Sequence, residues 1–341
     1  MKKFIALVVA IVGLGLLGSA CGGSGDDEGR VVVYSGRDEE LVAPLLEEFT
    51  DQSGIEVEAR YGDSAELAAT MLEEGENSPA TIFFSQDAGA LGAIEKDGLF
   101  AELPEDILDR VPEEFRSNEG KWVGISGRAR IVAYHADRVE PGELPATVDD
   151  MHDPIWEERF GWVPDNASFQ AFVTAMRVIR GDDQTEDWLS AMVDNGTRAY
   201  PGNTELRDAV AAGEIDAGIT NHYYIAQAMD EGGDDFQGKN YPVRIHSTEP
   251  DDPAALINVA GAGVLESSGA AVSGEELIEF LLNDASQEFF ADETKEYPLV
   301  PGVTADESLT PLDELASPDI DLTDLDDLGA TLEMVQRTGA L

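Results

Sequence analysis

The sequence has little of three kinds of residue that many functional sites require. It contains one cysteine, four histidines, and 21 lysines and arginines against 70 aspartates and glutamates, which gives a net charge of −49. A single cysteine cannot form a disulfide within the chain. The shortage of positive charge excludes a nucleic-acid partner, whose phosphates need lysine and arginine. The histidines are scattered, and the sequence has no nucleophile elbow, zinc-protease motif or cysteine–histidine pairing, so we expect no enzyme.

The N-terminus has the pattern of an export signal. Two lysines precede an apolar run at residues 4–17, which is too short to span a bilayer comfortably, and small residues follow it. Cys21 comes directly after them, as in bacterial lipoprotein signals, where such a cysteine is lipidated. We expect a signal peptide at residues 1–20 and a lipidated, flexible tether at residues 21–29. The alternative is a plain signal peptide with an incidental cysteine.

Short apolar runs alternate with helical patterns along the rest of the chain. Strands are expected at residues 30–34, 55–59 and 81–84, with a helical pattern after each of the first two. The middle of the chain repeats this order, with strands expected at residues 130–134 and 217–219. Such alternation predicts a parallel α/β sheet, and 341 residues suffice for two domains. The expected fold is α/β with two lobes, and a cleft between lobes is a common ligand site.

Two adjacent tyrosines lie where an expected strand gives way to an expected helix. Tyr223 and Tyr224 follow the strand at residues 217–219. Phenol oxygens at such a junction can reach into a cleft, and two deprotonated phenols form a hard anionic site that suits ferric iron. The alternative is an ordinary core pair packed on the sheet. His222 precedes the tyrosines and points to a different side of a helix, so we expect it to be structural.

Several segments, in this order, resemble the ferric-iron-binding proteins of bacterial ABC importers, a branch of the extracytoplasmic solute-binding proteins. They include Val-Val-Tyr-Ser-Gly-Arg at residues 32–37, Ile-Ser-Gly-Arg-Ala-Arg-Ile-Val-Ala-Tyr at 125–134, Asn-His-Tyr-Tyr at 221–224 and Glu-Tyr-Pro-Leu at 296–299. The resemblance implies a two-lobed periplasmic-binding-protein fold of type II, with hinge strands and a ferric ion in the interlobe cleft.

The same resemblance implies how the chain divides between the lobes. The first lobe would consist of residues 30–128 plus about 257–292. The second lobe would consist of residues 129–256 plus about 293–341. Closure of the two lobes around the ligand is the usual motion of such binding proteins.

The resemblance also implies ligands for the metal. Tyr223 and Tyr224 align with the two tyrosine ligands of the family. In the first lobe, Asp38 stands where the family has a histidine, and Gln86 stands where it has a glutamate. Asp38 would offer a carboxylate oxygen and Gln86 a neutral amide oxygen, with Asp87 as the alternative to Gln86.

Members of this family often complete the iron shell with a small anion such as phosphate or carbonate. The positions that would hold it here offer backbone N–H groups at a helix start, amide side chains or guanidinium groups. They are Asn166, Ala167, Asn203 and Asn221, with Arg128 and Arg130 as further candidates. For the two arginines, ion pairs with carboxylates are an equal alternative. Phe169 lies near the place where some members have a further tyrosine, and it cannot bind a metal.

Together these features predict a solute-binding lipoprotein that captures ferric iron with a synergistic anion and delivers it to an ABC permease. We expect an exported monomer, held at the outer face of the cell membrane through Cys21. Because Asp38 and Gln86 depart from the family, a same-fold protein for a polyamine, thiamine or a phosphorylated compound is the alternative. An extracytoplasmic hydrolase has the least support.

Overall fold

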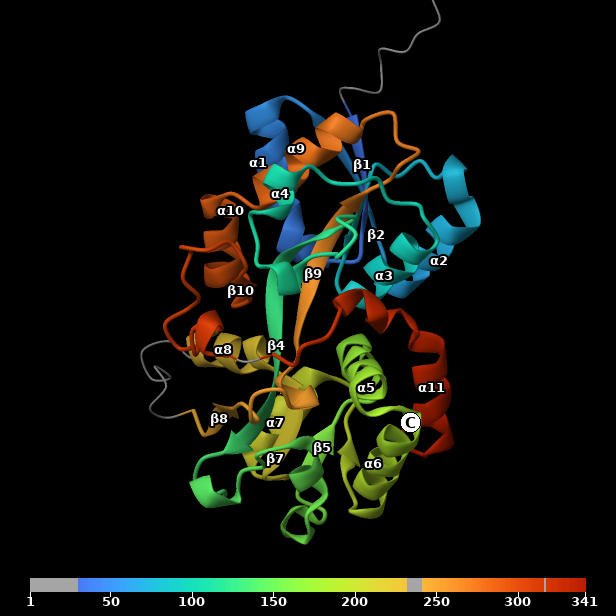
Figure 1. The fold of residues 1–341 in the computed structure, drawn as a ribbon. Helices are drawn as coiled ribbons and strands as arrows, with labels where there is room; N and C mark the ends of the chain where they lie inside the picture. Colours follow the sequence, from blue (N-terminus) through green and yellow to red (C-terminus); the bar gives the residue numbers. More distant parts are fainter. Residues whose placement is uncertain (1–29, 232–240, 316) are drawn as a thin grey trace, which may run out of the picture.

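The computed structural model describes residues 30–231, 241–315 and 317–341. The expected signal peptide, Cys21 and the tether lie outside these residues. Figure 1 shows two lobes, one above the other, with strands β4 and β9 running along the middle of the molecule. Within the described part of the chain, no helix combines the length and the apolar character needed to cross a membrane.

The first lobe is built on a sheet with helices on both sides. Its strands lie in the order β2 (Glu56–Tyr61), β1 (Arg30–Ser35), β3 (Ile82–Ser85), β9 (Ile257–Val264) and β4 (Val123–His135). Its helices are α1 (Glu39–Ser53), α2 (Ser64–Glu74), α3 (Ala88–Lys96), α4 (Glu105–Leu108), α9 (Ala271–Leu281) and α10 (Asp284–Phe289). Strands β1, β2 and β3 are parallel, as the sequence predicts, whereas β9 runs antiparallel to both β3 and β4.

The second lobe continues from the far half of β4. Its sheet contains β4, β7 (Ala217–Asn221), β5 (Phe160–Trp162) and β6 (Arg198–Ala199) in that order, and β8 (Val243–His246) pairs with β4. Its helices are α5 (Ala167–Arg180), α6 (Asp182–Asp194), α7 (Asn203–Ala212) and α8 (His222–Glu231). Phe169, near the expected anion loop, packs edge-on against Trp162 and Phe172 in the core of this lobe.

Strand β4 runs through both sheets and so links the two lobes covalently. Residues 123–129 pair with β9 in the first sheet, and residues 130–134 pair with β7 in the second. Strand β10 (Tyr297–Pro298) pairs with β4 at Gly127 and Ser126, which lie in the first sheet. This pairing places β10 beside the first lobe, although the sequence suggests that the chain has returned to the second lobe at about residue 293. The division between the lobes stays a prediction.

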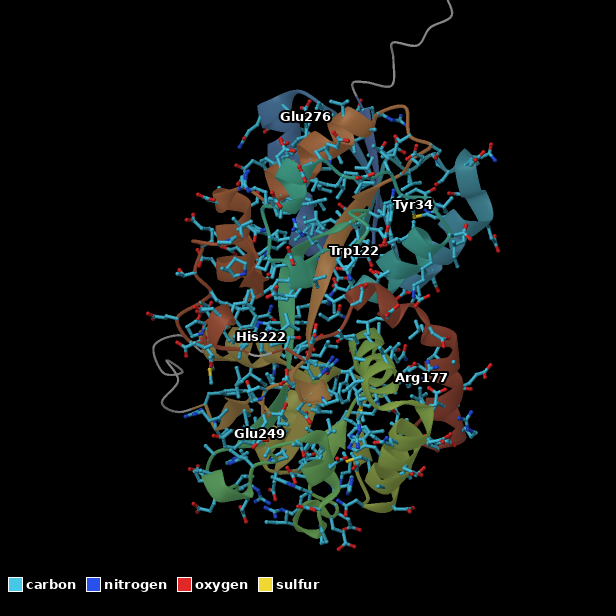
Figure 2. The ribbon with its side chains drawn as sticks, viewed as in Figure 1. Tyr34, Trp122, Arg177, His222, Glu249 and Glu276 are labelled. Atoms are coloured by element: carbon cyan, nitrogen blue, oxygen red, sulfur yellow. The ribbon has the colours of Figure 1, made fainter. Side chains whose placement is uncertain are left out.

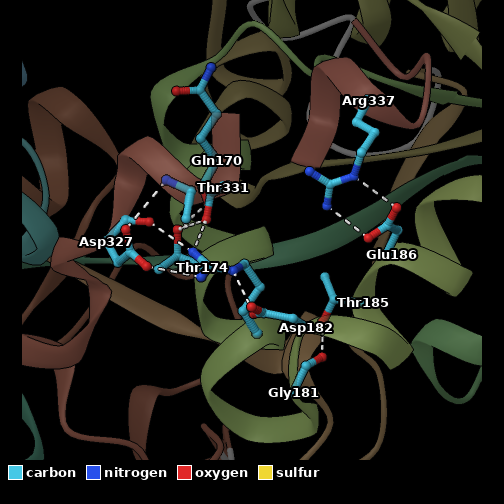
Figure 3. Close-up of polar contacts among 11 residues, drawn as sticks. Gln170, Thr174, Gly181, Asp182, Thr185, Glu186, Asp327, Thr331 and Arg337 are labelled. Carbon is cyan, nitrogen blue, oxygen red and sulfur yellow. Dashed lines mark hydrogen bonds and ion pairs between the residues drawn. The ribbon is translucent and has the colours of Figure 1, made fainter. Parts of the chain in front are cut away.

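The C-terminal segment contacts both lobes (Figure 1). The turn Leu322–Asp326 packs on α3, where Lys96 forms ion pairs with Asp324 and Asp326. Helix α11 (Leu328–Arg337) then packs on α5 and α6. Figure 3 shows the contacts of α11: a buried hydrogen bond of 2.8 Å between Thr174 and Thr331, and an ion pair of 2.9 Å between Arg177 and Asp327.

Two glycines of α3 allow the C-terminal turn to approach this closely. A Cβ atom at Gly92 would lie 2.2 Å from the carbonyl oxygen of Thr323, and one at Gly89 would lie 2.4 Å from that of Leu325. Both neighbours are backbone atoms, so they cannot rotate away. The turn therefore depends on small residues at these two positions.

We expect Gly92→Ala to lower the free energy of unfolding by about 1–3 kcal/mol, because the new methyl group must displace the turn. Gly329→Ala is the matched control, since Gly329 lies in α11 with no atom within 4 Å of its Cβ position. The control should stabilise the protein by up to about 1 kcal/mol through helix propensity. Urea unfolding of the two variants measures both effects. Equal stabilisation by both would show that the turn is not in contact with α3.

Candidate metal centre

The paired tyrosines open helix α8, directly after strand β7. Their rings lie 4.3 Å apart between centroids with an interplanar angle of 31°, and both side chains are partly exposed. Burial, followed by the adjacent Tyr224 phenol, raises the pKa of Tyr223. Tyr223 is therefore neutral at ordinary pH without a cation. A hard cation that binds both phenols must displace their protons, as metal binding to protein ligands generally does.

Two arginines of β4 lie next to the tyrosines. The positive charge of Arg128 favours the ionised form of Tyr223, and by itself it would lower the pKa of this tyrosine. Burial lowers the pKa of Arg130 to about 9, and ionised Tyr223 would oppose this change. A value of about 9 leaves the Arg130 guanidinium charged at neutral pH. The junction of the two lobes thus holds two cationic groups beside two groups that can become anionic.

A small cavity of about 10 Å³ lies at this junction. Its lining consists of Arg128, Arg130, Ser168, Asn221, Leu256 and Asn258. Three of its buried nitrogens have no hydrogen-bond partner: Nε of Arg128, Nη1 of Arg130 and Nδ2 of Asn258. All three are donors, so the cavity suits a group that accepts hydrogen bonds and carries negative charge. Its present volume is about that of one water molecule, so an anion larger than water needs side chains or lobes to move apart.

The arginines do not form the carboxylate ion pairs that the sequence left open. Arg128 donates through Nη2 to the carbonyl oxygen of Gln86, and Arg130 donates through Nη2 to the carbonyl oxygen of Ser168. The ion pairs found among the described residues involve neither arginine. Among the described residues, neither guanidinium is therefore in direct contact with a carboxylate, and both line the cavity, although the charge of Arg128 also acts at longer range on Asp87 and Glu296.

The expected anion loop lies at the start of α5. The Asn166 side-chain oxygen caps this helix by accepting from the backbone nitrogens of Ser168 (3.1 Å) and Phe169 (3.3 Å). Asn221 donates through Nδ2 to the Ser168 hydroxyl at 2.9 Å. Ala167 is the first residue of α5 and is exposed. Ser168 thus joins the loop, Asn221 and Arg130, although the sequence gave no reason to prefer it over its neighbours.

Asn203 lies one step farther from the cavity. It is buried at the start of α7, and its Oδ1 accepts a hydrogen bond of 3.0 Å from the Thr220 hydroxyl. Its Nδ2 is buried without a partner, but Asn203 does not line the cavity. Of the expected anion-binding residues, Asn221 and the two arginines line the cavity, and Asn166 is linked to it through Ser168. Ala167 and Asn203 do not line it.

The first-lobe candidates differ in how free they are to bind a metal. Asp38 is exposed at the start of α1, and its side chain does not cap that helix. Asp87 caps α3 by accepting from the Ala90 nitrogen at 3.1 Å, and burial raises its pKa. The Gln86 oxygen Oε1 accepts a hydrogen bond of 2.6 Å from Arg37. Asp38 is thus the first-lobe candidate whose oxygens are most accessible.

A buried ion pair behind Gln86 was not expected from the sequence. Arg37 donates through Nη1 and Nη2 to the two carboxylate oxygens of Glu296 at 3.0 and 2.9 Å, and its side chain is fully buried. Glu296 also accepts from the Ser126 hydroxyl at 2.7 Å. Both charged residues lie in segments that carry the family resemblance, but 259 positions separate them. No local pattern could have paired them.

His222 is held at both ring nitrogens, at the level where the lobes meet (Figure 2). Its Nδ1 accepts from the Ala129 nitrogen at 3.1 Å, so Nε2 carries the proton and donates to the Lys295 carbonyl oxygen at 2.8 Å. The ring also lies 4.5 Å from that of Tyr297. Burial lowers the pKa of His222 to about 4, so the ring is neutral at pH 7. Neither nitrogen is free for a metal, which agrees with the structural role expected for it.

Comparison with known proteins identifies the family. The family model described as bacterial extracellular solute-binding protein matches residues 77–318. The chain belongs to this family. This solute-binding protein is 31 % identical over 316 residues to the Fe(3+)-binding periplasmic protein of Serratia marcescens, covering 92 % of this chain and 91 % of the relative.

Solved structures agree with this assignment. Iron-bound HitA from Pseudomonas aeruginosa superposes with a TM-score of 0.81 and 31 % identity over 91 % of this solute-binding protein and 99 % of HitA. A Trichodesmium protein (IdiA, FutA) in complex with iron and citrate gives a TM-score of 0.80 and 26 % identity over 91 % and 99 % of the two chains. These likenesses confirm the two-lobed fold expected from the sequence. Membership of an extracellular family also means that the protein is exported.

Proposed function

We propose that the protein captures ferric iron between its lobes, together with a synergistic anion, and delivers it to an ABC permease. The observation that carries this proposal is the pair Tyr223 and Tyr224, whose rings lie 4.3 Å apart beside the charged Arg128 and Arg130. Two phenolates supply the hard oxygen donors that ferric iron prefers. The Serratia and Pseudomonas relatives, named for iron binding, support the same cargo.

Each residue has a role in this proposal. Tyr223 and Tyr224 bind the metal from the second lobe, and Asp38 approaches it from the first. The unpaired donors of Arg128, Arg130 and Asn258 hold the anion, beside Asn221 and the start of α5. The anion is phosphate, carbonate or a carboxylate such as the citrate of the Trichodesmium complex. Lipidation of Cys21, a monomeric state and action as a binding protein without catalysis complete the proposal.

An organic cation such as a polyamine or thiamine fits the junction poorly. The cavity there is about 10 Å³ and offers unpaired donors, whereas an organic cation needs acceptors and aromatic faces. The charged arginines would repel such a ligand. The geometry therefore favours a metal–anion pair over an organic cation, whereas a phosphorylated compound would also match the unpaired donors and is distinguished by the iron titration.

Titration of the apoprotein with ferric citrate, with and without added phosphate or carbonate, tests the proposal. Tyrosinate bound to ferric iron gives a visible charge-transfer band, which an organic complex lacks. We expect the band to grow to one equivalent of iron and to form at lower iron concentration when the anion is present. A colourless protein that retains no iron after gel filtration would refute the assignment.

A further inference from the structure

Helix α8, which carries the paired tyrosines, is fastened to two successive backbone carbonyl groups from a distant part of the chain. His222 donates through Nε2 to the Lys295 carbonyl oxygen at 2.8 Å, and Gln227 donates through Nε2 to the Thr294 carbonyl oxygen at 3.0 Å. A carbonyl oxygen only accepts, so the Gln227 amide must turn its nitrogen toward Thr294. A longer ion pair of 3.3 Å joins the exposed Asp230 to the Lys295 ammonium group. Helix α8 is therefore held from its first residue to its last turn.

The backbone that offers these carbonyls has an unusual shape. Residues Phe290–Thr294 form a single π-helical turn, a rare element that is often found at functional sites. Lys295 ends the turn in the left-handed region with a φ of 58°, which residues other than glycine seldom adopt. With this shape, the carbonyls of Thr294 and Lys295 both accept from α8. Local strain of this kind persists only where the surrounding contacts hold it.

The residues that follow Lys295 are tied to the first sheet. Glu296 accepts a hydrogen bond of 2.7 Å from the Ser126 hydroxyl and forms the buried ion pair with Arg37. Tyr297 pairs with Gly127 of β4, in the part of that strand that belongs to the first sheet. Helix α8 follows a strand of the second sheet, but the carbonyls that hold it are therefore anchored on the first-lobe side of the hinge.

A series of aromatic rings connects this anchor with the paired tyrosines. The His222 ring lies 4.5 Å from that of Tyr297 and 5.8 Å from that of Tyr223, to which it is edge-on at 89°. The Tyr223 ring in turn lies 4.3 Å from that of Tyr224. His222 cannot rotate freely, because the Ala129 nitrogen and the Lys295 carbonyl hold its two ring nitrogens. A displacement of Lys295 would therefore be passed through His222 to Tyr223.

We infer that Gln227 and Lys295 are positioning residues for the metal-binding phenols. They contact neither phenol oxygen, and they act by holding α8 against the hinge. Metal ligands must be held within about 0.5 Å of the productive geometry, and residues that orient ligands commonly contribute about 10–100-fold to metal affinity. This inference rests on the proposed function, because it requires Tyr223 and Tyr224 to bind the cargo.

Gln227→Leu tests the amide contact. Leucine keeps the approximate size but cannot donate to the Thr294 carbonyl, so we expect iron affinity to fall about 10-fold. Competition against a chelator measures the affinity, and the maximum of the charge-transfer band should shift because the two phenolates no longer meet the metal at the same angles. A residue that only stabilises the fold would lower the urea midpoint and leave affinity and band unchanged. That result would overturn the role of Gln227.

Gln52→Leu is the matched control for this variant. Gln52 is exposed on α1, where its amide donates to Glu48 of the same helix at 2.9 Å. The same change of side chain at this place should leave the iron affinity and the charge-transfer band unaltered. A loss equal to that of Gln227→Leu would show that the effect does not come from α8.

Two substitutions of Lys295 separate its backbone from its charge. Lys295→Asn and Lys295→Val both remove the ammonium group and its ion pairs with Asp230 and Asp306. Asparagine enters the left-handed region readily, whereas the β-branched valine does not. We expect Lys295→Val to lower iron affinity by at least about 10-fold and Lys295→Asn to bind nearly as tightly as the wild type. Equal losses would show that the ammonium group matters and the carbonyls do not, against the inference.

Hydrogen exchange of the metal-free protein gives a readout that needs no iron. The amides of α8 should exchange faster in Lys295→Val than in Lys295→Asn, because only valine displaces the carbonyls that hold the helix. Equal exchange in the two variants would contradict the inference.

The failures of the inference and of the proposed function can be told apart. Wild-type protein that gives no charge-transfer band would refute the proposed function. A normal wild-type band, together with wild-type iron affinity in Gln227→Leu and Lys295→Val, would refute only the positioning roles. If Lys295→Val does not fold, Gln227→Leu alone decides whether the contacts of α8 position the tyrosines.

Discussion

Tyr223→Phe and Tyr224→Phe are each expected to weaken iron binding by at least about 100-fold, and the double variant is expected to bind no iron and to be colourless. Each substitution removes one anionic oxygen from the metal. Metal sites with four protein ligands bind with apparent free energies of about 10–16 kcal/mol, so one ligand contributes about 3 kcal/mol. Because the phenyl rings remain, packing is kept and the loss reports the oxygen alone.

Competition against a chelator of known affinity, followed by the charge-transfer band, measures these losses. The pH must be fixed, because burial and Tyr224 raise the pKa of Tyr223 and iron binding therefore releases protons. Tyr34→Phe is the matched control, since Tyr34 is buried in the first lobe and its hydroxyl contacts Glu74. Asp38→Ala should cost less than either tyrosine. A larger loss for Asp38→Ala would make the first lobe the dominant metal site.

Glu296→Ala is expected to lower the free energy of unfolding at pH 7 by about 3–5 kcal/mol, because it leaves the fully buried charge of Arg37 without a partner. Glu186→Ala is the matched control. Glu186 pairs with Arg337 at 2.7 Å, but both side chains are exposed, so its loss should cost less than about 1 kcal/mol. Urea unfolding of the two variants compares a buried pair with an exposed one. Equal small losses would show that Arg37 is hydrated in solution.

The effect of Glu296→Ala should depend on pH in a defined direction. Burial alone would raise the pKa of Glu296, but the charges of Arg37 and Arg128 outweigh it, and the pKa is lowered in the folded protein. A carboxylate with a lowered pKa stabilises the fold at pH values above its unfolded pKa, and this contribution disappears as the pH falls toward the folded value. The difference between wild type and variant should therefore be largest at neutral pH and shrink below about pH 4.

Local sequence patterns predicted those parts of the fold that depend on local structure. The strands that became β1, β2 and β3 were visible because β-branched and apolar residues cluster there. Strand β4 was predicted only over residues 130–134, although it begins at Val123. Its first half contains Gly124 and Gly127, which disfavour a strand, and pairing with β9 and β10 makes it one. Tertiary pairing overrode local preference at that point.

In the candidate site, too, features that depend on neighbouring residues could be predicted from the sequence, whereas contacts between distant segments could not. The paired tyrosines were evident because two phenols adjoin at a strand–helix junction, whereas the loop at Asn166 was proposed only from the family resemblance. The choice between ion pairing and anion binding at Arg128 could not be made from composition, since 70 carboxylates made an ion pair plausible anywhere. The contact between Arg37 and Glu296, and hence the orientation of Gln86, depends on bringing together residues far apart in the chain.

The C-terminal segment constrains how the cleft can open. Asp326 is fastened to the last residue of α3 through Lys96, and the next residue, Asp327, is fastened to the last turn of α5 through Arg177. Adjacent residues are about 3.8 Å apart, so these two helix ends cannot separate while both contacts hold. Residues Gln86 and Asp87 adjoin the opposite end of α3, and Asn166 adjoins the opposite end of α5. The joined ends of α3 and α5 would then be the pivot of the motion. The opposite ends of the two helices would move apart when the cleft opens and approach each other when it closes on the cargo.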